Sequence, residues 1–169
     1  MGTATTRRRY AELDEIWARD EEIRLLGTLD PSVPADRLWR VRLTLRKPAG
    51  RPASARGHAL RPFQSARRTF WREPGPFIAT VTGDRFEVTV PIGSLALPLP
   101  LLDAQWDVHL VCEDEGEILE LRVGRHRGVP PKAESITFPW QRVEGRQRFR
   151  VRPGYRAGGD LVLESRRTR

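Results

Sequence analysis

The sequence predicts an all-β fold, on three observations. Apolar residues recur at every second position in most segments, which is the period of a half-buried strand. Glycine, proline and acidic residues separate these segments at short intervals, as turns do. No segment keeps the 3.6-residue apolar period of a surface helix. The 169 residues suit one domain, which we expect at 10–166, between a flexible basic terminus at 1–9 and a frayed end at 167–169.

The first two predicted strands lie between residues 10 and 29. A helix competes here because Leu13, Ile16 and Trp17 fit a helical stripe, but the continuation of that stripe meets charged residues. A period of two instead places Leu13 and Trp17 on one face. It also places a later apolar series on one face, namely Ile23, Leu25, Gly27 and Leu29. We therefore predict two strands joined at residues 18–21.

The next segment is the clearest strand in the chain. Its apolar residues alternate with polar ones, as Trp39, Val41, Leu43 and Leu45 alternate with Arg40, Arg42, Thr44 and Arg46. A proline- and glycine-rich stretch at 47–52 ends it. From there to Pro76 the pattern is irregular, and it indicates one short strand near His58–Gln64 within a loop.

Two hairpins are predicted in the middle of the chain. Alternation over residues 77–81 turns at 82–84 and resumes over 86–90. The apolar stretch 95–101 is twice broken by proline, so we expect an extended crossover that packs on the core. The second hairpin joins an apolar series from Trp106 to Cys112 with one from Leu119 to Val123, across an acidic turn.

The last predicted strands follow a proline-marked loop that carries Phe138 and Trp140 as lid candidates. Residues 149–152 alternate, and residues 161–165 complete the series after a glycine pair. In total the pattern predicts about nine or ten short strands. Many short alternating strands with intervening turns indicate an antiparallel β-sandwich, and we expect the immunoglobulin-like form of two sheets.

The charge balance is strongly basic, with a net charge of +8 and a pI near 11.0. Such a charge is typical of proteins that bind polyanions. Of the 30 basic residues, however, only Lys47 and Lys132 are lysines. A GC-rich coding background also enriches arginine, so a solvated basic surface is the alternative interpretation.

The cysteine and apolar content bears on location. Cys112 is the only cysteine, which excludes an intrachain disulfide, and three scattered histidines form no metal cluster with it. No apolar stretch reaches the length of a membrane span, and residues 1–9 lack the apolar core of a signal peptide. We expect a cytoplasmic protein, with the inner face of the membrane as a peripheral alternative.

Motifs for catalysis are absent from the sequence. It contains no nucleophile elbow, phosphate-binding glycine loop, dinucleotide fingerprint or zinc-protease motif, and no Asp-any-Asp pair of the kind used in nucleotide-sugar transfer. Asp107 and His109 share a strand face and could pair as orienter and base, but no nucleophile is evident nearby. We interpret Cys112 as a core residue and the acidic run 113–117 as a solvated turn. We expect no catalytic residue, no cofactor and no metal.

The candidate binding residues are arginines and aromatics. Two sets of arginines each share a strand face, Arg40, Arg42 and Arg46 in one set and Arg148, Arg150 and Arg152 in the other. If their strands are neighbours, like charges face each other and need relief from interleaved acids, from solvent or from an anionic polymer. Trp71, Trp140 and Tyr155 are candidates for stacking on sugar rings, with roles in the core or in pinning loops as the alternative.

Several segments carry a family resemblance. Residues 95–102, the run Gln105-Trp106-Asp107-Val108-His109-Leu110, the acidic glycine turn and residues 121–125 resemble the β-sandwich domains of actinobacterial wall-polymer glycosyltransferases and CDP-glycerol glycerophosphotransferases. The ending from Arg152 to Leu163 is similar to the closing strand pair of those domains. Glu15-Ile16-Trp17 and Leu25-Leu26-Gly27 fit their opening strands.

The resemblance implies an accessory role. In that family a separate domain performs the transfer, and the sandwich serves in polymer binding or oligomerisation. The implied function is a non-catalytic module that acts with a cell-envelope glycosyltransferase or teichoic-acid-type transferase and binds an anionic glycan polymer or a partner subunit, with homo-oligomers also expected. The alternative is a basic β-domain protein that binds nucleic acid.

Overall fold

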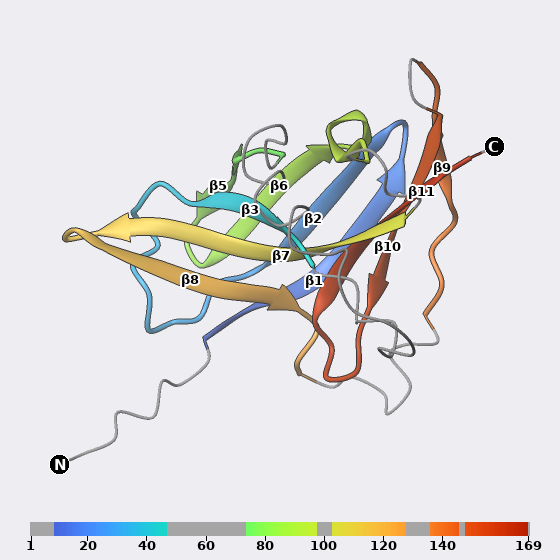
Figure 1. The fold of residues 1–169 in the computed structure, drawn as a ribbon. Helices are drawn as coiled ribbons and strands as arrows, with labels where there is room; N and C mark the ends of the chain where they lie inside the picture. Colours follow the sequence, from blue (N-terminus) through green and yellow to red (C-terminus); the bar gives the residue numbers. More distant parts are fainter. Residues whose placement is uncertain (1–8, 47–73, 98–102, 128–135, 146–147, 169) are drawn as a thin grey trace, which may run out of the picture.

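The computed structural model describes residues 9–46, 74–97, 103–127, 136–145 and 148–168, and it confirms the predicted all-β class (Figure 1). Eleven strands and one short 3₁₀ helix occur in these residues. None of the helical structure described is long or apolar enough to cross a membrane. The strand predicted near His58–Gln64 lies outside the described residues, as does Trp71.

The first sheet holds four antiparallel strands in the order β5-β6-β2-β1. These are β5 (Thr80–Thr82), β6 (Arg85–Pro91), β2 (Glu22–Thr28) and β1 (Tyr10–Arg19). The two-residue turn between β1 and β2 has positive φ at both positions, a backbone that matches the twist of a tight hairpin. The predicted junction at residues 18–21 is therefore confirmed.

The second sheet is organised around one long strand, β7 (Asp103–Asp114). Along one edge β7 pairs with β3 (Arg40–Leu45), which in turn pairs with the short β4 (Phe77–Ile78). Along the other edge, residues 103–107 of β7 pair with β11 (Leu161–Arg167), and residues 109–114 pair with β8 (Glu117–Gly124). The order continues from β11 through β10 (Phe149–Tyr155) to β9 (Gln141–Val143).

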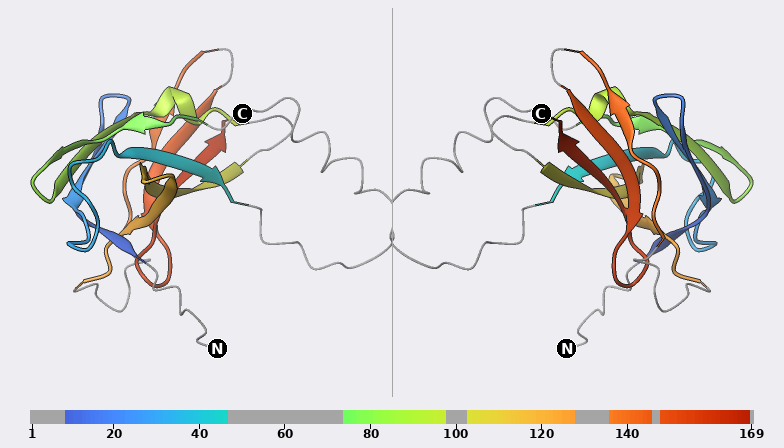
Figure 2. Two further views of the ribbon diagram at one scale, coloured as in Figure 1. Left: turned by 90° about the vertical axis from the view of Figure 1, so that its left-hand side faces the viewer. Right: turned by 90° about the vertical axis from the view of Figure 1, so that its right-hand side faces the viewer.

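The two sheets are joined into one continuous hydrogen-bonded sheet where β1 runs parallel to β8, over residues 10–12 and 122–124, a pair that the predicted antiparallel fold does not contain. The other strand pairs described are antiparallel. In side view the strands β2, β5 and β6 lie apart from β9, β10 and β11, so the sheets form two layers (Figure 2). β11 ends at Arg167, one residue into the segment expected to be frayed.

The core between the layers is built from the inward positions of the predicted alternating strands. Its largest fully buried side chains include Trp39, Trp106 and Phe86. One buried polar residue, Ser165, accepts a hydrogen bond from Trp106 Nε1 at 3.0 Å and donates one to the carbonyl of Leu95 at 3.1 Å. A short 3₁₀ helix over Ile92–Leu95 leads into the expected crossover at 95–101, of which residues 98–101 lie outside the described residues.

The sequence-based placement of Trp17 is wrong. Leu13 is 1% exposed, but Trp17 is 45% exposed on the outer face of β1. Leu13 pairs with Gly27 and Glu15 with the adjacent Leu26, so Asp14 is an extra residue without a partner in β2. Such a bulge reverses the side on which all later residues of the strand point.

Candidate functional site

The outer face of β9, β10 and β11 carries arginines that lie opposite one another. Arg142 on β9 pairs in register with Arg150 on β10, which pairs with Arg166 on β11. Phe149 and Val151 are buried in the core, so the alternation of β10 turns Arg150 outward. Neighbouring strands lie about 4.8 Å apart, and like charges at that spacing repel each other.

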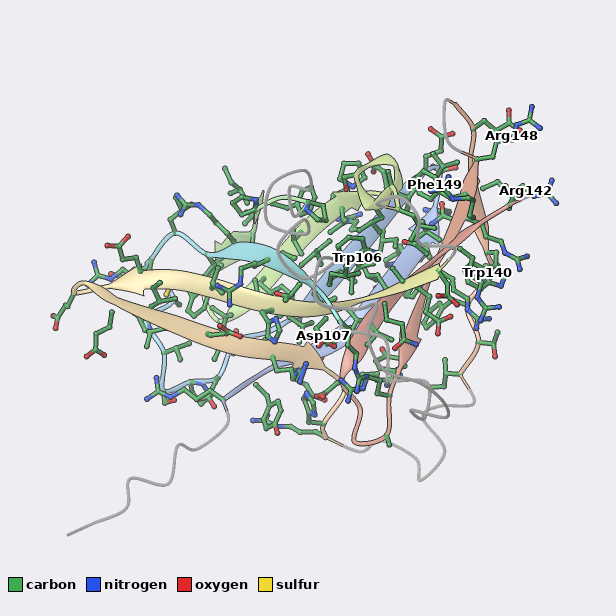
Figure 3. All side chains as sticks on the ribbon, in the orientation of Figure 1. Trp106, Asp107, Trp140, Arg142, Arg148 and Phe149 are labelled. Carbon is green, nitrogen blue, oxygen red and sulfur yellow. The ribbon has the colours of Figure 1, made fainter. Side chains whose placement is uncertain are left out.

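Trp140 lies within this row, immediately before β9 (Figure 3). The guanidinium carbons of Arg152, Arg150 and Arg166 lie 4.4, 4.7 and 5.4 Å from the centroid of its ring. A guanidinium over an aromatic face is worth about 0.5–1 kcal/mol at an exposed site. The indole therefore holds three cationic side chains together. We call this set, Trp140 with Arg142, Arg150, Arg152 and Arg166, the arginine cluster.

The positive charge of the arginine cluster is only partly compensated. Arg152 forms an ion pair with Glu164, at 2.7 Å between Nε and Oε2. Within the described part of the chain, no carboxylate lies at ion-pair distance from Arg142, Arg150 or Arg166. The Nε of Arg150 is also buried without a hydrogen-bond partner there. The cluster thus presents surplus guanidinium donors, which suit an anion.

Arg148 extends this positive surface beyond the cluster. It is exposed at the start of β10 and lines a hollow of about 280 Å³ whose wall also includes Arg142, Glu144 and Phe149. Figure 3 shows Arg148 and Arg142 at the same end of the β9–β10 pair. The second predicted set of arginines therefore gathers at one end of the molecule.

The first predicted set lies elsewhere. Its strand, β3, is separated from β10 by β7 and β11, so the two sets do not form a common ladder. Arg42 is bound to Glu120 on β8. Arg40 is exposed, and the backbone N–H of Arg46 donates to the carbonyl of Gln105 at 2.8 Å.

Of the three aromatics proposed for stacking, Trp140 belongs to the arginine cluster. Tyr155 is 8% exposed, and its ring centroid lies 6.3 Å from that of Phe138, which packs against the core. Burial raises the pKa of Tyr155 to about 12. Its ring face is therefore occupied by protein, and Phe138 is part of the same packing.

Asp107 and His109 belong to ion-pair networks on the outer face of β7. Asp107 lies 3.1 Å from Arg122 and 3.3 Å from Arg156, measured between oxygen and nitrogen. His109 Nε2 lies 3.4 Å from a carboxylate oxygen of Glu120, and burial lowers the pKa of this histidine. Two guanidinium groups engage the Asp107 carboxylate, an arrangement that ties strands together. Cys112 is buried, as predicted.

Two residues of the cluster, Arg142 and Arg166, were missed by the sequence interpretation. Both became relevant through strand pairing, which a single sequence does not specify. Arg166 was close to the expected frayed end, and Arg142 stood alone in an irregular segment. In the described ranges, no group of three or more His, Cys, Asp or Glu residues gathers in a way that could hold a metal ion.

Comparison with known proteins identifies the fold. No family model and no curated protein matches the chain. Among solved structures, it is similar to S. aureus TarS, with a TM-score of 0.60 and 14% identity over 95% of this chain and 25% of that one. It is also similar to the structure of TarS 217-571, with a TM-score of 0.58 and 15% identity over 96% of this chain and 40% of the other. The chain thus spans a minor part of each.

Proposed function

We propose that this protein is a non-catalytic accessory β-sandwich that acts with a cell-envelope glycosyltransferase and binds an anionic, phosphate-containing glycan polymer through the arginine cluster. The observation that carries this proposal is the in-register row of Arg142, Arg150 and Arg166 around Trp140. The resemblance of the sequence to wall-polymer glycosyltransferase domains, together with the shared fold with part of S. aureus TarS, supports the association with polymer transfer. A cytoplasmic location at the inner face of the membrane fits this role.

The chemistry of the cluster favours a polyanion. A guanidinium group binds phosphate oxygens through two parallel hydrogen bonds, and such charge-assisted bonds are about twice as strong as neutral ones. Three guanidinium groups without a carboxylate partner among the described residues repel each other until an anion lies between them. A polymer with regularly spaced phosphates supplies several such anions along one chain.

A second surface supports the association with a partner protein. Leu38, Ile78 and Ile118 are 52%, 67% and 71% exposed, and they are three of the four large apolar residues that the described chain exposes. Ile78 pairs with Arg40 on β3, and Ile118 lies beside the β7–β8 turn, so both belong to the part of the second sheet formed by β3, β4, β7 and β8. These exposed apolar side chains are candidates for contact with a partner protein.

The test measures binding of the purified chain to polyglycerol phosphate, to polyglutamate and to single- and double-stranded DNA at two salt concentrations. We expect Arg150→Ser combined with Arg166→Ser to weaken binding to polyglycerol phosphate about 25-fold at roughly 0.1 M salt, because each phosphate contact contributes about 0.7 decades there. The slope of log affinity against log salt should fall by about 1.4.

The matched control is Arg40→Ser combined with Arg85→Ser, which removes the same charge from other exposed positions. It should keep most of the affinity. An equal loss in both double variants, or the absence of binding to any polymer, would contradict the proposal. Stronger binding to DNA than to polyglycerol phosphate through the same residues would favour the nucleic-acid alternative.

A further inference from the structure

Trp17 forms a second exposed aromatic site, on the sheet opposite to the arginine cluster. The bulge at Asp14 turns its indole from the core to the outer face of β1. Bulges often re-aim a side chain next to a functional site. In this position the large ring is 45% exposed, so a ligand in solution can reach it.

Polar neighbours fix the orientation of this ring. The indole Nε1–H of Trp17 donates to Oε2 of Glu15 at 3.0 Å. The guanidinium carbon of Arg19 lies 4.9 Å from the ring centroid. Glu15 and Arg19 lie two residues before and after Trp17, so the alternation of β1 places all three on one face. The ring is therefore held in position although it faces solvent.

The strands beside Trp17 add a matched pair of charges. Arg24 on β2 is the direct cross-strand partner of Trp17, and its Nε donates to Oε1 of Glu87 on β6 at 2.6 Å. The hydrogen bond from Arg24 lowers the pKa of Glu87 below its ordinary value. Glu22 is the direct cross-strand partner of Arg19, and Asp20 lies 3.7 Å from it, so each guanidinium near the indole has a carboxylate partner. This face has no surplus of positive charge, in contrast to the arginine cluster.

We propose that Trp17, flanked by Glu15, Arg24 and Glu87, is a binding site for an uncharged pyranose sugar. The C–H groups on one face of a pyranose carry partial positive charge and pack against the negative face of an indole. Adjacent sugar hydroxyls donate to carboxylates and accept from guanidiniums, which Glu87 and Arg24 present within one sheet face. The carboxylates beside Arg19 and Arg24 leave a polyanion no net attraction here. This site is independent of the proposed polymer binding.

Arg19 is the side chain that a ligand would displace. Its side chain is 70% exposed, and its contact with Asp20 is 3.7 Å long, so little energy holds it over the ring. A sugar that stacks on the indole takes the place of this guanidinium.

The test follows the indole N–H resonance of Trp17 in the full chain, titrated with cellotetraose, maltotetraose and chitotetraose. At least one tetrasaccharide should shift this resonance, which is assigned by its loss in Trp17→Ala. The affinity for that tetrasaccharide, measured by titration calorimetry because the variants lack the resonance, should fall about tenfold in Trp17→Ala and about threefold in Trp17→Phe, which keeps the stacking but loses the N–H donor. Trp140→Ala is the matched control and should bind the sugar as the unchanged chain does.

Two results would overturn this assignment. One is the absence of any shift of the Trp17 resonance at millimolar tetrasaccharide in a chain whose spectrum shows it to be folded. The other is a change of sedimentation from an oligomer to a monomer in Trp17→Ala, which would assign this face to a second copy of the chain. Loss of polyglycerol phosphate binding in the arginine variants affects neither result, so the two proposals fail separately.

Discussion

Trp17 and Trp140 lie on the outer faces of different sheets, and each has an arginine stacked on its ring. Their surroundings differ in charge. Around Trp17, ion pairs and a hydrogen-bonded carboxylate balance the guanidiniums, whereas around Trp140 a row of arginines has one glutamate partner among the described residues. The same residue type thus marks a surface without surplus positive charge on one sheet and a cationic surface on the other.

The register of the strands produces this difference. In the first sheet, Arg24 on β2 reaches Glu87 on β6, so opposite charges meet between neighbouring strands. In the second sheet, the pairing of β9, β10 and β11 places arginine opposite arginine. Exposed ion pairs contribute only about 0–1 kcal/mol to stability. The contrast therefore matters more for what each face binds than for folding.

The largest expected effect comes from Gly27→Ala, which removes the structural basis of the Trp17 face. Gly27 pairs with Leu13 at the bulge, and a Cβ at this position would lie 2.1 Å from the carbonyl oxygen of Glu12 and 2.6 Å from the ring of Phe86. Backbone at that distance must shift. We expect a loss of about 3 kcal/mol in the free energy of unfolding, measured with urea.

The control for this substitution is Gly93→Ala, because a Cβ there meets no atom within 4 Å. It should change the free energy of unfolding by less than about 1 kcal/mol. In Gly27→Ala the Trp17 resonance should also move, while the polyglycerol phosphate affinity of the folded protein stays the same. A Gly27→Ala protein as stable as the unchanged chain would show that the bulge does not depend on close strand approach.

A smaller effect is expected from Trp140→Ala, which tests whether the indole organises the arginine cluster. Without the ring, the guanidiniums of Arg150, Arg152 and Arg166 lose their common contact and spread apart. We expect polyglycerol phosphate to bind about fivefold more weakly, equivalent to ~1 kcal/mol of lost cation–π interaction. Trp140→Phe, which keeps an aromatic face, should retain most of the affinity. Tighter binding to Trp140→Ala would mean that the ring competes with the ligand.

The sequence predicted the parts of the fold that depend on local alternation. The strand faces from Trp39 to Leu43 and from Trp106 to Cys112 have the predicted inner residues, because a side chain in a regular strand alternates with its neighbours. Trp17 was misplaced because a bulge changes that alternation without a distinctive sequence signal. Pairing between distant strands, which unites Arg142 with Arg166, depends on the packing of the whole chain and is not encoded in any one segment.

The smallest expected effect concerns His109, on the half of the second sheet where charges balance. Its neighbours Arg42, Arg122, Asp107 and Glu120 already form ion pairs, and burial opposes an additional cation. The pKa of His109 is lower in the folded protein than in the unfolded chain. As the pH falls, the unfolded state therefore binds a proton at this histidine before the folded state does. The contribution of the neutral His109 side chain to the free energy of unfolding is therefore fully present above the unfolded pKa of about 6.5, and it is lost as the pH falls below that value.

His109→Gln should remove this part of the pH dependence. Between about pH 7.5 and pH 5.5, the free energy of unfolding in urea should fall less in the variant than in the unchanged chain, because the variant lacks the group that the unfolded state protonates first. An equal decline in both proteins would show that His109 accepts its proton without cost. In that case the region around His109, whose charges are paired, would accept a further positive charge as the arginine cluster does. The contrast between the two surfaces would then depend on their exposure to solvent rather than on ion pairing.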